Sequence, residues 1–240
     1  MNVVISQSML FPWVGILEQI RLAGVYVYYD DVQFSKGSFT NRVQVKLPSG
    51  MRWMSIPLQG AHLGQAIEAT RVVPAEAWRG KHMQLLRQSF EATPFAADAL
   101  AMADEIFSGT YDSIGMLARA SLMALVRYFA LDESCKFIDV RDLQIGGSGS
   151  SRVLEIVRSL KGNCYITGHG AVDYLEHEVF EKAGIKVEYM DYQLRAYPQQ
   201  HGAFTPYVTG LDLVANCGKD GIAFISSPTK PWRSFLNDAT

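Results

Sequence analysis

The sequence predicts an α/β protein with a mostly parallel, Rossmann-like sheet, a helical insertion and a β-hairpin. Three observations support this prediction. Residues 1–29 follow a strand–helix–strand pattern, the last third of the chain alternates short apolar strands with helices, and the middle is helical throughout. Alternating strands and helices are typical of parallel sheets, because each crossover helix returns the chain to the same edge.

The opening βαβ unit is the clearest part of this pattern. Residues 3–7 form an apolar run that predicts a buried strand, and residues 13–23 carry apolar side chains at helical spacing. Pro12 stands where the first turn of a helix tolerates proline, and Gly24 ends the helix. Residues 25–29 are β-branched and aromatic, which favours a second strand.

A hairpin and a helical segment follow. Residues 44–47 and 52–56 flank Pro48-Ser49-Gly50, whose turn chemistry predicts a β-hairpin. Residues 67–73 are expected to form a short strand. From residue 75 to 131 the chain is rich in Ala, Leu and Met with helical periodicity. Three helices are expected there, separated at Thr93-Pro94 and at Gly109-Thr110.

The last third returns to strand–helix alternation, which places its strands in the same sheet as the opening unit. Strands are expected at 136–140, 164–167 and 186–189, and helices at 152–160, 173–183 and 209–214. The chain is therefore divided into an α/β core (1–74 and 132–218), a helical insertion or subdomain (75–131) and a C-terminal tail (219–240).

Composition limits the classes of partner and compartment. The formal net charge is −2, so the whole surface has no excess of one sign that would attract nucleic acid or an anionic membrane. No apolar run approaches the roughly 18 residues that a membrane span needs, and no basic leader precedes the first strand. The odd number of cysteines (Cys135, Cys164 and Cys217) suits a reducing compartment. We therefore expect a cytoplasmic protein.

Polar side chains gather after the second predicted strand. Asp30 and Asp31 follow it directly, and Gln33, Asn41 and Arg42 come soon after. A carboxylate in this position can act as a base or orient an amine, and an arginine can clamp a phosphate or carboxylate. Turn or capping roles for the two aspartates are equally consistent with the spacing.

Two further segments stand at predicted strand or helix ends. The run 146–151, which includes Ser148 and Ser150, precedes a helix and could cradle phosphate with backbone N–H groups. It lacks the P-loop lysine and the dinucleotide fingerprint, so a flexible helix start is the alternative. His169 lies between two glycines after a strand, where it could be a general base, a ligand contact or a turn histidine.

Other chemistries find no support in the sequence. The remaining histidines show no metal-ligand spacing, and no cysteine lies near enough to complete a site. No Gly-x-Ser-x-Gly motif is present, which argues against a serine hydrolase. We expect no metal and no bound cofactor.

A rigid aromatic loop follows the last predicted strand. Tyr197, Gln199 and Phe204 lie in it, and Pro198 and Pro206 restrict its backbone. Such a loop could cover the strand ends and stack on a sugar or base, or it could be a packed surface loop. Its aromatic residues are also compatible with a homodimer.

Taken together, these segments resemble the WbqC-like protein family, which takes its name from bacterial O-antigen gene clusters. The resemblance runs from Ser6-Gln7 to about Gly218. Ser8 stands where the family commonly has proline, and His169 where a small residue is more usual, so His169 is not carried over as a family catalytic residue. The residues that carry the resemblance are Gln7, 11–15, 30–33, Asn41-Arg42, Gly168, 170–171, 197–199, 204–206 and 211–213.

The resemblance implies work on unusual bacterial surface sugars, including dideoxy amino sugars that carry aminoacyl groups. It suggests transfer of an acyl or aminoacyl group from an activated donor, either free or carrier-bound, to the amine of a nucleotide-linked sugar. We expect Asp31 or His169 as the base, Asn41 and Gln33 as oxyanion donors, and Arg42 with 146–151 as the phosphate clamp. Further substrate contacts are expected from Gln7, Trp13, Asp30, Ser148, Ser150, Tyr197, Gln199 and Phe204.

Two other functional classes stay open at this point. The Pro-x-x-Gly turn at 12–15 is faintly similar to HIGH-type nucleotidyltransferases, but that stretch contains none of their paired histidines. A non-catalytic module that binds a sugar nucleotide or a carrier protein is the other alternative. No nucleic-acid partner is expected, because no basic stripe is interleaved with the aromatic residues.

Overall fold

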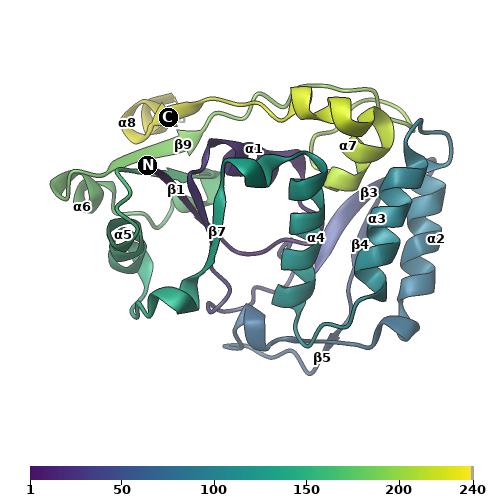
Figure 1. Cartoon of the computed structure of the whole chain (residues 1–240), viewed down its shortest axis with the longest axis horizontal. Helices are drawn as coiled ribbons and strands as arrows, with labels where there is room; N and C mark the ends of the chain where they lie inside the picture. Colours follow the sequence, from purple (N-terminus) through teal and green to yellow (C-terminus); the bar gives the residue numbers. More distant parts are fainter. Residues whose placement is uncertain (239–240) are drawn as a thin grey trace.

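The computed structural model describes residues 1–238, and its centre is a six-stranded sheet. The strand order is β10-β9-β8-β1-β2-β7, with β10 antiparallel to β9 and all other neighbours parallel (Figure 1). This arrangement confirms the predicted α/β class and its mostly parallel sheet. The strands are β1 (Asn2–Ser6), β2 (Val25–Tyr28), β7 (Lys136–Asp139), β8 (Cys164–Thr167), β9 (Lys186–Met190) and β10 (Thr229–Pro231).

The order of the strands contains one reversal of direction across the sheet. The chain starts at β1 in the interior of the sheet, moves outward through β2 to β7, and returns to place β8 on the other side of β1. In open α/β sheets, ligands bind at the carboxyl ends of the strands where the order reverses. The fold therefore favours a ligand site between the ends of β1 and β8.

Helices cover both faces of the sheet. Val4 of β1 belongs to the core cluster on the side of α1, α4 and α7, whereas Val3 and Ile5 belong to the cluster on the side of α5, α6 and α8. Strands buried on both faces read as continuous apolar runs, as the sequence of β1 does. The bounds are α1 (Val14–Leu22), α5 (Gly149–Ser159), α6 (His177–Lys182), α7 (Gly210–Cys217) and α8 (Trp232–Asp238).

The hairpin and the helical insertion lie beside the sheet, on the right of Figure 1. The hairpin consists of β3 (Arg42–Leu47) and β4 (Gly50–Ser55), and it confirms the predicted turn. The three expected helices are present, with their breaks where the sequence placed them. They are α2 (Arg79–Phe90), α3 (Ala96–Ser108) and α4 (Ile114–Tyr128).

Several boundaries differ from the sequence prediction. Of the expected strand at 67–73, only β6 (Arg71–Val72) forms, paired with β5 (Leu58–Gln59). Ile67–Ala69 is a 3-10 turn because its first two N–H groups donate to the carbonyls of Val32 and Asp30. α5 starts three residues early, at Gly149, and α6 starts at His177 rather than 173.

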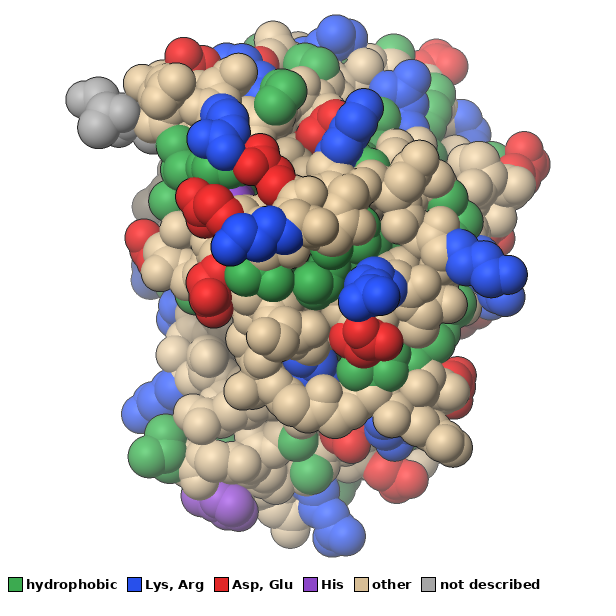
Figure 2. Space-filling view, turned by 90° about the vertical axis from the view of Figure 1, so that its left-hand side faces the viewer, with side chains coloured by type: hydrophobic (Ala, Val, Ile, Leu, Met, Phe, Trp, Pro, Cys, Tyr) green, Lys and Arg blue, Asp and Glu red, His purple; other side chains and the backbone are tan. Residues whose placement is uncertain are grey.

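Residues 219–238 contribute to the sheet and its cover. β10 adds the antiparallel edge strand, and α8 packs Trp232 on His177 with ring centroids 4.5 Å apart. Within residues 1–238, no helix is both long and apolar enough to cross a membrane. On the side of the molecule shown in Figure 2, basic and acidic side chains are interspersed, as expected from the net charge of −2.

Candidate functional site at the switch point of the sheet

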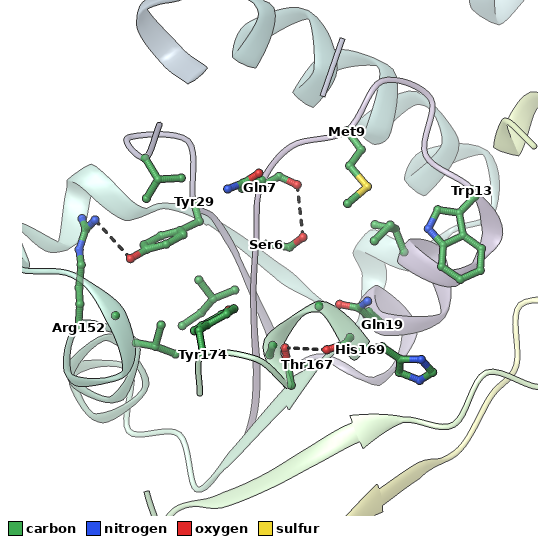
Figure 3. A pocket seen from close by; sticks show the side chains of 18 of the residues that line it. Ser6, Gln7, Met9, Trp13, Gln19, Tyr29, Arg152, Thr167, His169 and Tyr174 are labelled. Atoms are coloured by element: carbon green, nitrogen blue, oxygen red, sulfur yellow. Dashed lines mark hydrogen bonds between the residues drawn. The ribbon is translucent and has the colours of Figure 1, made fainter. Parts of the chain in front are cut away.

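A cavity of about 870 Å³ opens at the carboxyl ends of β1 and β8, where the strand order reverses. Its floor is formed by Ser6 and Gln7 after β1 and by Thr167 and Gly168 at the end of β8. In Figure 3, Arg152, Tyr29 and Tyr174 lie on one side of these residues, and Trp13, Gln19 and His169 lie on the other. The volume is in the range of small-molecule sites, and the cavity has two chemically different ends.

A fixed cation marks the first end. The Arg152 guanidinium donates to both carboxylate oxygens of Asp31, at 3.1 and 2.5 Å, and its Nε donates to the Ile145 carbonyl at 3.0 Å. It also lies over the Tyr29 ring, 4.9 Å from the centroid, and only 9% of its side chain is exposed. Hydrogen bonding to Asp31 raises the pKa of Arg152. The positive charge is therefore held in one orientation beside the cavity.

The start of α5 adds backbone donors at the same end. Gly147, Ser148 and Gly149 line the cavity, and the Ser148 side chain at the N-cap makes no capping hydrogen bond. The first N–H groups of a helix have no partner within it, and the helix dipole favours an anion there. Combined with Arg152, this end is suited to a phosphate or other anion.

Three aromatic rings define the second end. Trp13 lies 4.9 Å from Tyr192 and 5.5 Å from Tyr207 between ring centroids. The Trp13 ring folds back over Gly15: a Cβ at that position would lie 2.2 Å from the ring, so only glycine fits. The Pro-Trp-Val-Gly segment thus turns the tryptophan into the wall of the cavity rather than outward.

His169 and a hydrogen-bonded pair lie next to this aromatic end. His169 Nε2 is 2.8 Å from the Met190 carbonyl. Because a carbonyl only accepts, Nε2 carries the proton and Nδ1 is the acceptor. Gln19 Nε2 donates to the Tyr192 hydroxyl at 2.6 Å, and burial raises the pKa of Tyr192. The Tyr192 hydroxyl therefore keeps its proton and can donate it to a ligand.

The electrostatic character of the cavity follows from its lining. Among the described residues that line it, Arg152 is the one permanent cation, and none is aspartate or glutamate. The carboxylate nearest to the anion-binding end is Asp31, which is paired with Arg152 outside the cavity, and an amine at the opposite end meets no carboxylate in the lining that would stabilise its protonated form.

Comparison with known proteins places the chain in a family. A model of the WbqC-like protein family matches residues 7–224. The chain belongs to the WbqC-like protein family. It is 28% identical to a Mycobacterium tuberculosis protein named Uncharacterized protein Rv1507c. The alignment spans 222 residues, which is 91% of this chain and 95% of that protein. No solved structure matches the chain.

Four residues that the sequence of this WbqC-like chain singled out line the cavity: Gln7, Trp13, Ser148 and His169. Asp31 lies just outside, in a shallow pocket on the far side of Arg152, and it orients that arginine. Its role as a base stays a prediction, as does that of His169.

Asp30 and Ser150 form hydrogen bonds to chain segments that line the cavity. Asp30 is fully buried and accepts hydrogen bonds from the backbone and hydroxyl of Ser8, at 2.8 and 2.6 Å, and from Arg119 Nε at 2.6 Å. Ser150 Oγ accepts from the Glu176 N–H at 2.9 Å and donates to the Tyr174 carbonyl at 3.3 Å. Neither lines the cavity, and direct substrate contact by them stays a prediction.

Asn41 and Arg42 lie at the start of the hairpin, whereas Gln33 forms an isolated bridge with Ala66, and none of the three lines the cavity. Asn41 Nδ2 donates to the Ile56 carbonyl at 3.0 Å, which ties the start of β3 to the end of β4. Gln33 is exposed, and the Arg42 guanidinium lies 4.1 Å from the centroid of the Trp53 ring. Their assignment as oxyanion donors and phosphate clamp stays a prediction.

Tyr197 is buried, and Gln199 and Phe204 are half-buried and pack against other parts of the protein. The Tyr197 hydroxyl donates to Asp212 at 3.0 Å, and Gln199 accepts from the Thr205 N–H at 2.9 Å and from Lys46 Nζ at 3.2 Å. Phe204 packs edge-on against Tyr197, 5.2 Å between centroids. These contacts fasten the loop that carries Tyr207 to the cavity mouth, and direct substrate contact by the three residues stays a prediction.

Among the cavity-lining residues that the sequence did not single out, five contribute polar or aromatic groups to its two ends. Tyr29 and Arg152 carried a partial signal, because one ends a strand and the other lies in the first turn of a helix. Gln19 and Tyr192 are 173 positions apart, and nothing local in the sequence pairs them. The five are Gln19, Tyr29, Arg152, Tyr174 and Tyr192.

The described residues form no metal-binding cluster, and Cys164 and Cys217 are not activated thiols. In the described part of the chain, no group of three or more His, Cys, Asp or Glu side chains is placed to hold a metal ion. Burial raises the pKa of Cys164 and of Cys217 to about 11, so neither thiol is activated as a nucleophile.

Proposed function

We propose that this WbqC-like protein transfers an acyl or aminoacyl group to the amine of a nucleotide-linked amino or deoxyamino sugar used in bacterial surface polysaccharides. The observation that carries the proposal is a single cavity at the switch point of the sheet. It joins an anion-binding end at Arg152 to an end with a proton acceptor, His169, and a proton donor, Tyr192. Membership in the WbqC-like family supports the surface-sugar setting.

The anion-binding end suits the diphosphate of the sugar nucleotide. Arg152 and the first N–H groups of α5 would bind the phosphate oxygens, and Tyr174 offers an exposed ring for the base. The sugar would then lie over Gln7 and Thr167, which line the cavity between its two ends (Figure 3). This places the sugar amine toward His169.

The transfer step uses the opposite end. His169 Nδ1 accepts a proton from the amine, whose nitrogen attacks the carbonyl carbon of an activated acyl group such as a thioester. Tyr192 donates a hydrogen bond to the carbonyl oxygen as negative charge develops there. The new carbon–nitrogen bond forms, the carbon–sulfur bond breaks, and the thiolate leaves and takes up the proton as a free thiol.

The aromatic trio of Trp13, Tyr192 and Tyr207 receives the donor group in this arrangement. Its rings can cover an apolar acyl chain, and they can also hold the ammonium of an aminoacyl group through cation–π contact. Both donor classes therefore belong in the test.

A thermal-shift screen of sugar nucleotides, followed by a transfer assay with acyl and aminoacyl thioesters, tests the proposal. We expect stabilisation by a nucleotide-linked amino sugar, and formation of an amide product. His169→Ala should lose turnover but keep binding, whereas His62→Ala, at an exposed loop histidine, should keep both. Full turnover in His169→Ala would remove the assigned base, and silence toward every sugar nucleotide would refute the proposed function.

A further inference from the structure

Apolar and basic side chains gather on the hairpin and on the segment that precedes it, in what we call the hairpin patch: Lys36, Phe39, Arg42, Met51 and Trp53. Four of them are exposed, and Arg42 is half-buried. The exposed fractions of the three apolar members are 36% for Phe39, 40% for Met51 and 42% for Trp53. Trp53 contacts Phe39, 5.7 Å between ring centroids, and lies under the Arg42 guanidinium. Methionine, tryptophan and arginine are the side chains that protein interfaces favour over other surface.

The positive charge of the hairpin patch has no acidic partner within residues 1–238. Among the described ion pairs, none involves Lys36 or Arg42. Arg42 Nε is buried and has no hydrogen-bond partner. A surface that combines unpaired cations with exposed aromatic rings complements a partner whose surface is acidic around an apolar centre.

Two backbone hydrogen bonds connect the hairpin patch to the mouth of the cavity. The Leu10 N–H donates to the Phe39 carbonyl at 3.0 Å, and the residue before Leu10, Met9, lines the cavity. The Thr209 N–H donates to the carbonyl of Gln44, which is paired with Trp53 across the hairpin. Tyr207, at the aromatic end of the cavity, is two residues, or at most about 8 Å of chain, from Thr209.

We propose that the hairpin patch docks an acidic carrier protein that delivers the acyl group as a thioester on a flexible arm. The inference rests on the proposed function, and it names the partner of the aromatic end. The arm would enter beside Tyr207 and present the carbonyl to His169. The amide bond forms on the sugar nitrogen, the carbon–sulfur bond of the thioester breaks, and the carrier leaves with a free thiol.

Binding of acetylated acyl carrier protein, a strongly acidic carrier, tests the docking surface by calorimetry. Lys36→Glu with Met51→Ser changes two exposed residues and is expected to weaken binding about tenfold or more. Arg42→Glu should weaken it further. The control is Arg87→Glu with Met116→Ser, at an exposed arginine and methionine of the helical insertion, which should leave the Kd unchanged.

A second readout separates docking from chemistry. The Lys36→Glu with Met51→Ser variant should raise KM for the carrier-bound acetyl group but leave KM for acetyl-pantetheine unchanged. Failure of the wild type to bind the carrier, equal Kd in all variants, or preferred binding of a single-stranded oligonucleotide at the patch would overturn the inference. Transfer from acetyl-pantetheine without carrier binding would leave the proposed function standing, whereas patch-dependent binding without transfer from any donor would refute only the transferase.

Discussion

Replacing Asp212 with asparagine is expected to remove a pH-dependent destabilisation of the folded protein. Asp212 lies on α7, is 3% exposed, and accepts a hydrogen bond from the Tyr197 hydroxyl at 3.0 Å. Burial raises its pKa from 3.8 to about 6, although the Tyr197 hydrogen bond and the charge of Lys46 act in the opposite direction. The folded state therefore binds a proton at Asp212 more tightly than the unfolded chain does.

The sign and size of the effect follow from this difference. Below about pH 3.8 the carboxyl is protonated in both states and contributes nothing. As the pH rises from 3.8 to about 6, the unfolded chain releases its proton first, so stability falls. Above pH 6 the full destabilisation is present, and the gap between 3.8 and about 6, at about 1.4 kcal/mol per pH unit, amounts to about 3 kcal/mol.

Urea unfolding of wild type and Asp212→Asn between pH 3.5 and 8 measures this directly. The amide oxygen still accepts from Tyr197, so the variant removes the ionisable group with little change in shape. The free energy of unfolding of the variant, minus that of wild type, should rise by about 3 kcal/mol across the range. Asp220→Asn, at an exposed aspartate, is the control. A difference that stays flat or falls with pH would refute the reasoning.

Three other variants test the cavity. Asp31→Ala removes the carboxylate that orients Arg152, and nucleotide-sugar affinity should fall about tenfold in calorimetry. Unchanged affinity would show that the Asp31–Arg152 ion pair does not contribute to binding. Tyr192→Phe removes the proposed oxyanion donor and should lower kcat by roughly 100-fold at constant KM, whereas a rise in KM alone would reassign Tyr192 to binding. Gly168→Ala places a Cβ 3.1 Å from the Tyr192 hydroxyl and 3.2 Å from Gln19 Nε2, and should lower the free energy of unfolding by about 1–3 kcal/mol. An unchanged unfolding midpoint in urea would show that Tyr192 and Gln19 move aside without cost.

Much of the fold was predictable because its elements are specified locally. The apolar runs of β1 and β8 and the helical periodicity of 75–131 appear in the sequence within windows of 5 to 15 residues. The general rule for parallel sheets then placed Gln7 and His169 near strand ends, and both line the cavity. Interrupted segments such as 67–73 were less predictable, since their N–H groups bond to a distant part of the chain.

The sequence by itself determined which segments become strands and helices, and that the parallel strands would gather polar residues at their carboxyl ends. The tertiary structure alone decided which of those residues face the cavity. Asp30 and Asp31 are chemically identical neighbours, yet one is buried against Ser8 and Arg119 and the other orients Arg152, 121 positions away. Periodicity is a local property of the backbone, whereas such pairings depend on how the topology brings distant segments together.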